Sequence, residues 1–261
     1  MKLSVVIPAH NEEDCIGSTL RALYQILSES KISHEILVVN DHSTDGTHWL
    51  LLGLQKNIHT LRILSNESFQ GYGMAVRLGL DNYHGDAVAV FMADGSDDPG
   101  DLLKFFQVLI ERNVDCVFGS RFIRGGKANG YPPLKLVLNR FANWFIQLLF
   151  GLAYNDVTNA FKLYRREVID GLRPFLSWHF NLTVELPLKA LVRGYSYEVV
   201  PNSWLNRKSG ISKFKIREMG SRYLFIILYC FIEKWLSRGD YTRPPVSNET
   251  LLKNRKPAEY R

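Results

Sequence analysis

The first half of this chain of 261 residues alternates between short runs of apolar, β-branched residues and longer segments whose apolar residues recur at helical spacing. The short runs predict buried strands at residues 3–9, 35–40, 61–64, 87–92 and 116–119. The longer segments predict helices at residues 12–27, 45–54, 73–83 and 99–111. Strands and helices that alternate in this way form a parallel sheet covered on both faces. The sequence therefore predicts an α/β fold with a mostly parallel sheet flanked by helices.

The second half of the chain is less regular. A loop rich in glycine and proline is expected at residues 125–133, followed by an apolar helix at residues 134–149. A further strand is expected at residues 195–200, a basic loop at residues 201–212, and a long helix at residues 214–236. Residues 237–261 are polar and contain three prolines, so we expect a weakly ordered tail there.

Acidic residues gather where the predicted strands end, and ligands of such folds bind beyond the carboxyl ends of the strands. Asp41 and Asp45 follow the second strand, and Asp94, Asp97 and Asp98 follow the fourth. Carboxylates at one sheet edge bind a hard cation such as Mg²⁺, which usually shares its shell with substrate phosphates. The alternative for Asp45, Asp97 and Asp98 is a structural role as helix N-caps.

Several familiar sites are excluded by their missing motifs. The sequence has no G-x-G-x-x-G after the first strand, which argues against a dinucleotide-binding oxidoreductase, and no Walker A or H-E-x-x-H motif. Its three cysteines lie far apart, so neither a disulfide framework nor a zinc ribbon is expected. These observations favour a cytoplasmic protein.

The net charge of +6 is concentrated in two segments. Residues 121–140 hold five basic residues and no acid, and residues 203–222 hold six basic residues and one acid. Such a focused positive field suits an anionic partner: phosphates, an acidic membrane surface or nucleic acid. The basic loops lack the interleaved aromatic residues of stacking nucleic-acid readers, so nucleic acid is disfavoured. Two solvated surfaces remain the structural alternative.

No apolar run is long enough to span a membrane: the longest covers residues 224–232, whereas a spanning helix needs roughly 20 residues. This run lies within the helix predicted at residues 214–236, which has basic residues near both ends and aromatic residues between them. That pattern is typical of an interfacial helix on an anionic lipid surface. The alternative is a helix packed on the sheet or on a partner protein.

Three segments at the predicted strand ends resemble the opening signatures of family 2 glycosyltransferases. They are residues 6–12 (VIPAHNE), 39–47 (VNDHSTDGT) and 92–99 (MADGSDDP). Later segments are similar to the polyprenyl-phosphate (dolichol-phosphate) mannose synthase branch of that family: residues 119–126, 156–162 (DVTNAFK) and 207–213 (RKSGISK). The likeness covers residues 3–215, and the order and spacing of the motifs make it more specific than any motif alone.

The resemblance implies a GT-A fold in a single domain at residues 1–236, with a nucleotide-sugar half at 1–122 and an acceptor half at 123–236. It implies a catalytic set of Asp94, Arg121, Arg207 and Lys213. The base, ribose and phosphates of the nucleotide sugar are assigned to Pro8, His10, Glu12, Asn40, Asp41, Asp94 and Arg121. A divalent cation, Mg²⁺ or Mn²⁺, is assigned to Asp94, Ser96 and Asp97, and the acceptor to Lys135, Arg140, Lys162 and Glu185.

Four positions depart from the family pattern. Met92 stands where the family has the first aspartate of its D-x-D motif, which makes Asp97 a candidate replacement. Asn40 replaces an aspartate, His10 a tyrosine, and Lys162 an arginine, with loss of the bidentate fork at the last position. These changes leave the fold prediction intact and bear on metal dependence and donor identity.

The resemblance implies transfer of a sugar, mannose or glucose, from a nucleotide sugar to a polyprenyl phosphate on the cytoplasmic face of a membrane. A lipid phosphate is already ionised, so it needs positive groups rather than a general base. A hydroxyl acceptor on a cell-surface glycan is the alternative; it requires a base, for which Asp156 and Glu185 are the candidates. A non-catalytic nucleotide-sugar-binding protein is a third possibility. We expect a peripheral membrane protein, with a separate membrane-anchoring partner as a further option.

Overall fold

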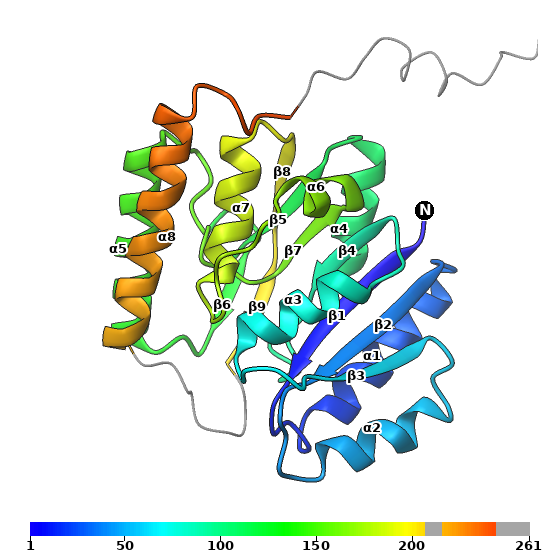
Figure 1. The fold of residues 1–261 in the computed structure, drawn as a ribbon. Helices are drawn as coiled ribbons and strands as arrows, with labels where there is room; N and C mark the ends of the chain where they lie inside the picture. The colour runs from blue at the N-terminus through cyan, green and yellow to red at the C-terminus, as the bar shows by residue number, and fades with distance from the viewer. Residues whose placement is uncertain (207–215, 244–261) are drawn as a thin grey trace, which may run out of the picture.

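The computed structural model describes residues 1–206 and 216–243, and a seven-stranded sheet forms their centre (Figure 1). The strand order is β3-β2-β1-β4-β7-β5-β8. All neighbouring strands are parallel except β7, which runs antiparallel to both β4 and β5. The strand bounds are β1 Leu3–Ala9, β2 His34–Asn40, β3 Leu61–Ser65, β4 Ala87–Val90, β5 Cys116–Ser120, β7 Lys162–Arg165 and β8 Tyr197–Pro201. A separate two-stranded parallel sheet pairs β6 (Lys127–Asn129) with β9 (Ser203–Leu205).

Helices cover both faces of the large sheet, because successive side chains of a buried strand point to opposite faces. Val5 and Ile7 of β1 pack in a core with α1, α2 and α4, whereas Val6 packs in a second core with α3, α5, α6, α7 and α8. The helix bounds on the first face are α1 Ile16–Glu29, α2 Thr47–Gln55 and α4 Pro99–Glu111. On the second face they are α3 Tyr72–Asn82, α5 Pro133–Phe150, α6 Arg166–Gly171, α7 Leu182–Val192 and α8 Ile216–Leu236.

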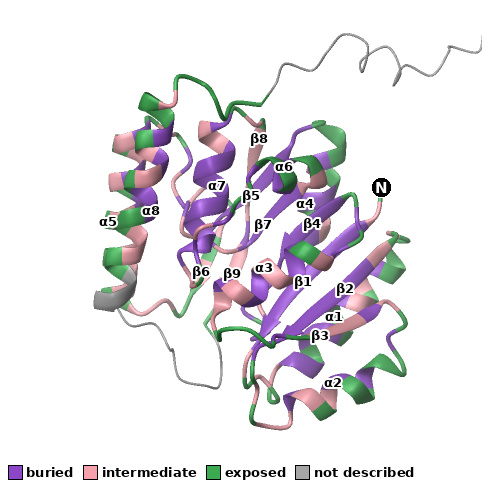
Figure 2. Cartoon of the chain, in the orientation of Figure 1, coloured by how far each residue is buried: buried purple, intermediate pink, exposed green. Residues whose placement is uncertain are grey.

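Helices α5 and α8 lie side by side at one end of the molecule and bury little of their surface (Figures 1 and 2). Phe150 of α5 contacts Phe231 of α8, and Lys234 of α8 donates a hydrogen bond to the Phe150 carbonyl at 2.8 Å. Most of the large apolar side chains of the two helices are exposed: Leu134, Val137, Leu138, Phe141, Trp144, Leu148, Leu224, Phe225, Leu228, Ile232, Trp235 and Leu236. Among the described residues, no helix is long and apolar enough to cross a membrane.

The structure confirms the predicted α/β class and contains every strand and helix expected in the first half. It differs in three places that the sequence pattern did not indicate. Strand β7 enters the sheet antiparallel, helix α7 precedes β8, and the expected loops hold the short strands β6 and β9. Residues 237–243, expected to begin a weakly ordered tail, pack on the body: Arg243 contacts Asp115 at 2.6 Å and the Tyr195 ring at 5.6 Å. Residues 244–261 lie outside the described residues.

Candidate functional site

The carboxyl ends of β1 and β2 form the first wall of the site. Asp41, immediately after β2, is buried, and its carboxylate accepts hydrogen bonds from Asn66 Nδ2 at 2.7 Å and from the Gly71 N–H at 2.9 Å. His10, immediately after β1, lies with Nδ1 2.6 Å from the Asp41 carbonyl oxygen, and Gln70 Nε2 lies 3.0 Å from the same nitrogen. Polar groups from three loops are therefore held in fixed positions beside this sheet edge.

The neighbouring residues of this wall are part of the framework. Pro8 is buried in β1 and pairs in register with Val39 of β2. Asn40 accepts a hydrogen bond from the Ser43 N–H at 3.3 Å, and the Glu12 N–H donates to Thr47 Oγ1 at 2.9 Å. The structure thus gathers the five residues assigned to the base and ribose, Pro8, His10, Glu12, Asn40 and Asp41, at adjacent strand ends.

The loop after β4 carries two buried carboxylates close together. Asp94 Oδ1 accepts a hydrogen bond from the Ser96 N–H at 3.1 Å, and Asp97 Oδ2 accepts one from the Met92 N–H at 3.2 Å. Gly95 between them has a φ of +70°, which favours glycine and lets the chain turn tightly. Burial, and then the nearby Asp94 charge, raise the pKa of Asp97 to about 7. Two buried carboxylates that interact electrostatically in this way favour a bound cation.

The donor set fits a hard divalent cation that shares its coordination with a substrate. No group of three or more His, Cys, Asp or Glu side chains positioned to hold a metal ion occurs in the part of the chain that the structure describes. Asp94 and Asp97 would therefore supply two oxygen ligands, and water or phosphate oxygens the remainder. Asp98 has the structural role considered as the alternative: it is the N-cap of α4 and accepts a hydrogen bond from the Gly100 N–H at 2.8 Å.

Arg121 forms a buried ion pair at the carboxyl end of β5. Its Nε and Nη2 donate to the two oxygens of Asp156 at 2.8 and 2.7 Å, and its backbone N–H donates to the same carboxylate at 3.0 Å. Burial opposes the charge, but the Asp156 carboxylate raises the pKa of Arg121 above its ordinary value. Both Asp156 oxygens are thus engaged, and the side chain is fully buried, so it is poorly suited to act as a general base.

A second guanidinium joins Arg121 through an aromatic ring. The Phe122 ring lies 5.3 Å from the Arg121 guanidinium carbon and 4.5 Å from that of Arg140, which projects from α5. Arg140 also donates a hydrogen bond to the Asn155 carbonyl at 3.0 Å. Lys135 lies on the same helix and is half-buried. We call Arg121, Phe122 and Arg140 the cationic wall.

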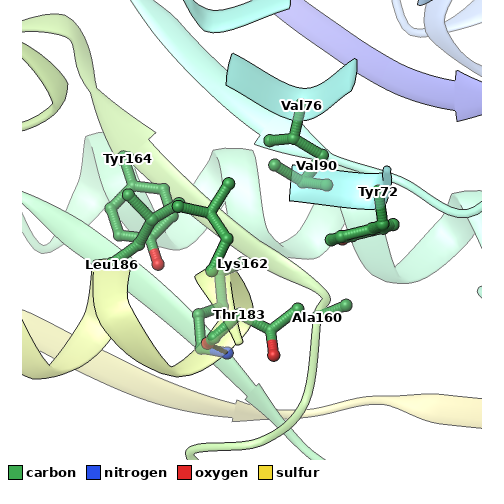
Figure 3. Close-up of a pocket in the computed structure, with 9 residues that line it drawn as sticks. Tyr72, Val76, Val90, Ala160, Lys162, Tyr164, Thr183 and Leu186 are labelled. Atoms are coloured by element: carbon green, nitrogen blue, oxygen red, sulfur yellow. Dashed lines mark hydrogen bonds between the residues drawn. The ribbon is translucent and has the colours of Figure 1, made fainter. Parts of the chain in front are cut away.

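Lys162, expected to bind the acceptor, lies inside the protein instead. Its Nζ donates to the carbonyl oxygens of Val157 at 3.0 Å, Asn159, and Thr183 at 3.2 Å. Burial lowers its pKa to about 7. The side chain borders an interior cavity of about 10 Å³, shown in Figure 3, which has room for about one water molecule but not for a phosphate. β7 is a central strand, between β4 and β5, and the chain before it and the start of α7 enclose the Lys162 side chain.

Glu185, expected to contact the acceptor or act as a base, is also fully buried. Its two oxygens accept hydrogen bonds from the Leu176 and Ser177 N–H groups, both at 2.7 Å, and from Lys189 Nζ at 2.6 Å. The carboxylate therefore fixes the segment before α7 rather than facing a substrate. The structure removes Lys162 and Glu185 from the acceptor site because burial leaves neither polar group accessible.

Three aromatic residues near the carboxylates were missed by the sequence analysis. Burial, followed by the charge of Asp97, raises the pKa of Tyr72, and its ring lies 4.2 Å from that of Phe180. The ring centroids of Tyr131 and Trp204 lie 4.9 Å apart, and the backbone of Trp204 forms an isolated β-bridge with Asp97. No periodic pattern marks these residues, because Tyr72 begins α3, Tyr131 lies in a loop and Trp204 lies in the short strand β9, and these segments converge only in the folded chain.

Arg207 and Lys213, both assigned to catalysis, lie outside the described residues. The chain leading to them passes directly beside the carboxylate loop. The Leu205 N–H donates to the Ser96 carbonyl at 2.9 Å, and the Asn206 N–H donates to the Asn129 carbonyl at 3.0 Å. The last described residues before Arg207 therefore lie close to Ser96 and Asn129.

Comparison with known proteins identifies the family of the chain. Residues 4–173 match the family model described as glycosyl transferase family 2. The chain is 31% identical over 241 residues to the polyprenol monophosphomannose synthase of Mycolicibacterium smegmatis, covering 84% of this chain and 86% of that protein. It is 25% identical over 241 residues to the undecaprenyl-phosphate mannosyltransferase of Micrococcus luteus, covering 90% and 96%.

The fold is also similar to that of a solved enzyme. Glucosyl-3-phosphoglycerate synthase from Mycobacterium tuberculosis, in complex with UDP, superposes with a TM-score of 0.67 at 16% identity, covering 88% of this chain and 80% of that one. At this identity the likeness concerns the fold alone. The match to the family model and the 31% identity to the polyprenol monophosphomannose synthase show that this chain belongs to glycosyl transferase family 2.

Proposed function

We propose that the protein transfers a hexose, mannose or glucose, from a nucleotide sugar to a polyprenyl phosphate. The observation that carries this choice of acceptor is the state of the two candidate bases. Asp156 and Glu185 are both fully buried and engaged by Arg121 and Lys189 respectively. A hydroxyl acceptor needs a base to remove its proton, whereas a phosphate does not. The names of the two curated relatives point to the same acceptor class.

The donor would bind across the strand ends, with its base near Asp41 and His10 and its diphosphate near Asp94 and Asp97. A divalent cation, Mg²⁺ or Mn²⁺, would be held by these two carboxylates and Ser96; when bound, it supplies positive charge beside the departing diphosphate. Structures of glucosyl-3-phosphoglycerate synthase, which has a similar fold, contain UDP with Mn²⁺ or Mg²⁺. This arrangement keeps the base and the diphosphate at separate strand ends.

The cationic wall would bring the acceptor phosphate to the donor. Two anions repel each other, and the charge of Arg140, together with that of Arg121 as far as Asp156 leaves it uncompensated, would offset that repulsion before the reaction begins. Because Arg121 is already locked by Asp156, its guanidinium does not need to reorganise when a phosphate arrives. Lys135, which lies on α5 with Arg140, would add positive charge, and we assign Arg207 and Lys213 to the phosphates as well.

The apolar surface of α5 and α8 would rest on the cytoplasmic face of a membrane, where a polyprenyl phosphate resides. The exposed leucine, phenylalanine and tryptophan side chains provide apolar area, and Lys135 and Arg140 provide attraction to anionic lipid. A membrane-anchoring partner protein is the alternative occupant of this surface. The protein would then act as a peripheral membrane enzyme.

The test is an assay of the purified chain with radiolabelled GDP-mannose, UDP-glucose and related donors, each with detergent-dispersed polyprenyl phosphate. We expect label to enter the organic phase with one donor, in a reaction that requires Mg²⁺ or Mn²⁺ and stops with a chelator. Label that appears only in a water-soluble product would indicate a hydroxyl acceptor. Tight donor binding without turnover on any acceptor would indicate a binding protein.

A further inference from the structure

A pocket of about 430 Å³ lies outside the proposed catalytic site, between α8 and the segment that precedes α7. Its walls combine apolar side chains with groups that bind anions or hydroxyls. They are Leu176, Trp178, His179, Asn181, Ser221, Arg222 and Phe225. We call it the α8 pocket. A volume of several hundred Å³ suits a small ligand or a headgroup.

The backbone around this pocket is fixed before any ligand arrives. The Leu176 and Ser177 N–H groups donate to buried Glu185, and the Trp178 carbonyl accepts a hydrogen bond from the Met74 N–H at 3.1 Å. From the opposite side, the Tyr223 hydroxyl of α8 donates to the Phe180 carbonyl at 3.4 Å. The fully buried Lys189–Glu185 pair therefore supports a preorganised pocket wall.

Asn181 provides the most specific chemical indication. Its side chain lines the pocket and is 5% exposed, yet its buried Oδ1 has no hydrogen-bond partner among the described residues. A buried amide oxygen without a partner costs about 1–3 kcal/mol, so it favours a ligand that brings a hydrogen-bond donor. Arg222 and His179 offer positive charge or N–H groups to the same space, which favours a phosphate.

The pocket opens beside the apolar surface of α5 and α8. Phe225 belongs to both, with 60% of its surface exposed, and Trp178 is 49% exposed. Exposed tryptophan and phenylalanine at such a boundary are typical of side chains that sit at the headgroup level of a bilayer. A ligand that enters the pocket from a membrane would therefore carry its phosphate inward and leave its acyl chains along α8.

We propose that the α8 pocket binds the headgroup of an anionic phospholipid that carries a hydroxyl group, such as phosphatidylglycerol. Arg222 and His179 would contact the phosphate, and a headgroup hydroxyl would donate to Asn181 Oδ1. Phosphatidic acid has the charge without the headgroup hydroxyl, and phosphatidylcholine has neither the net charge nor the hydroxyl. The inference rests on the membrane location proposed above and is independent of the transfer reaction.

The experiment measures partition of the full chain onto phosphatidylcholine vesicles that contain phosphatidylglycerol or phosphatidic acid. We expect Arg222→Gln to weaken binding to both anionic vesicles about fivefold, the value of one lost basic contact at a membrane surface. We expect Asn181→Leu to reduce the ratio of phosphatidylglycerol to phosphatidic acid binding about fivefold, the value of one lost hydrogen bond. Lys56→Gln, at the exposed end of α2, is the matched control and should change neither.

Three results would overturn the inference. An unchanged lipid ratio in Asn181→Leu would rule out the hydroxyl contact, and unchanged binding in Arg222→Gln would rule out the phosphate contact. Because Arg222 is only half-buried on α8, this second variant stays informative if Asn181→Leu folds poorly. Loss of the phosphatidylglycerol preference on adding polyprenyl phosphate would assign the pocket to the acceptor. The transfer assay in detergent decides the proposed function separately, since it contains no vesicles.

Discussion

At the scale of single residues, the same amino-acid type has different roles according to its neighbours. Asp94 and Asp97 lie in the loop after β4, where the Asp94 charge helps to raise the pKa of Asp97. Asp98 caps a helix one residue later, and Asp156 forms a buried ion pair with Arg121. All four are acids in loops, but only the first two form a buried pair of like charges. The proposed cation site therefore depends on placement rather than on the number of acids.

We predict that Asp94→Asn and Asp97→Asn each lower sugar transfer by about a hundredfold or more, the range seen when one group that stabilises transition-state charge is removed. Single-turnover rates with the active donor, together with a thermal unfolding scan, check this. Asp98→Asn is the matched control: asparagine caps a helix as well as aspartate, so both activity and stability should persist. Full activity in Asp94→Asn would place the cation elsewhere.

Glu35 gives a prediction about stability that is separate from the site. Burial acts to raise its pKa, but hydrogen bonds from the Ser4 hydroxyl, the His84 N–H and Arg62 outweigh this, and the net pKa lies below the ordinary value of 4.5. The folded state therefore holds the proton of Glu35 less tightly than the unfolded state. The ionised carboxylate stabilises the fold at pH values above the unfolded pKa, and this contribution is lost as the pH falls through the folded pKa.

We therefore predict that Glu35→Gln lowers the free energy of unfolding by about 2 kcal/mol at about pH 7, the value of hydrogen bonds to a charged group. The difference from the unmodified protein should shrink when urea unfolding is measured below about pH 4. Glu111→Gln, at an exposed position, is the control and should show little change at either pH. A pH-independent loss would mean that packing, not charge, is responsible.

At the scale of secondary-structure elements, buried ion pairs fix the helices that border the proposed acceptor region. Arg193 after α7 donates to both oxygens of Glu233 in α8, at 2.7 and 3.0 Å, and both side chains are 3% exposed. Arg193 also donates to the Gly171 carbonyl at 2.7 Å, which joins α6 to the same cluster. This contact holds α8 against the body of the protein.

We predict that Arg193→Met destabilises the protein by about 3–5 kcal/mol, because it leaves the Glu233 carboxylate buried without a counter-charge. The double variant Arg193→Met with Glu233→Met should recover a large part of that loss, since it removes the unpaired charge and restores apolar packing. Urea unfolding of the two variants measures the difference. Equal stability of the single and double variants would show that the unpaired Glu233 carboxylate does not destabilise the protein.

At the scale of the whole molecule, the structure is polar around the carboxyl ends of β1, β2 and β4 and apolar along α5 and α8. Exposed apolar side chains cover these two neighbouring helices (Figure 2), whereas the strand-end loops carry buried carboxylates and arginines. Contiguous exposed apolar surface of this kind marks a site of association in soluble proteins. The proposed contact with lipid requires such an apolar surface.

We predict that Trp144→Glu in α5 or Leu228→Glu in α8 reduces partition onto anionic vesicles by about tenfold. Each change replaces an exposed apolar side chain, which lipid would cover, by a negative charge that the anionic surface repels. Trp49→Glu is the matched control, since Trp49 on α2 is 74% exposed but lies on the opposite side of the sheet. Transfer to a detergent-dispersed acceptor should be unchanged in all three. Equal binding of the four proteins would contradict a membrane role for α5 and α8.

The sequence by itself determined the fold class, the strands and helices of the first half, and the family. Apolar runs and helical spacing report directly how each segment is buried, and β1 and α4 have the bounds predicted for them. The sequence also placed Asp41, Asp94 and Asp97 at strand ends, because parallel strands present their carboxyl ends at one edge. These properties depend on local pattern and on a single rule of topology.

Only the tertiary structure decided which of the charged residues are enclosed in the core. The resemblance assigned Lys162 and Glu185 to the acceptor, but both are buried in the fold, where backbone groups and Lys189 satisfy them. Arg121 and Arg140 belong to the same cluster only because both guanidinium groups pack against the Phe122 ring. Periodicity indicates whether a position is buried, whereas the partner of a buried charge is set by residues far away in the chain, which become neighbours only when the chain folds.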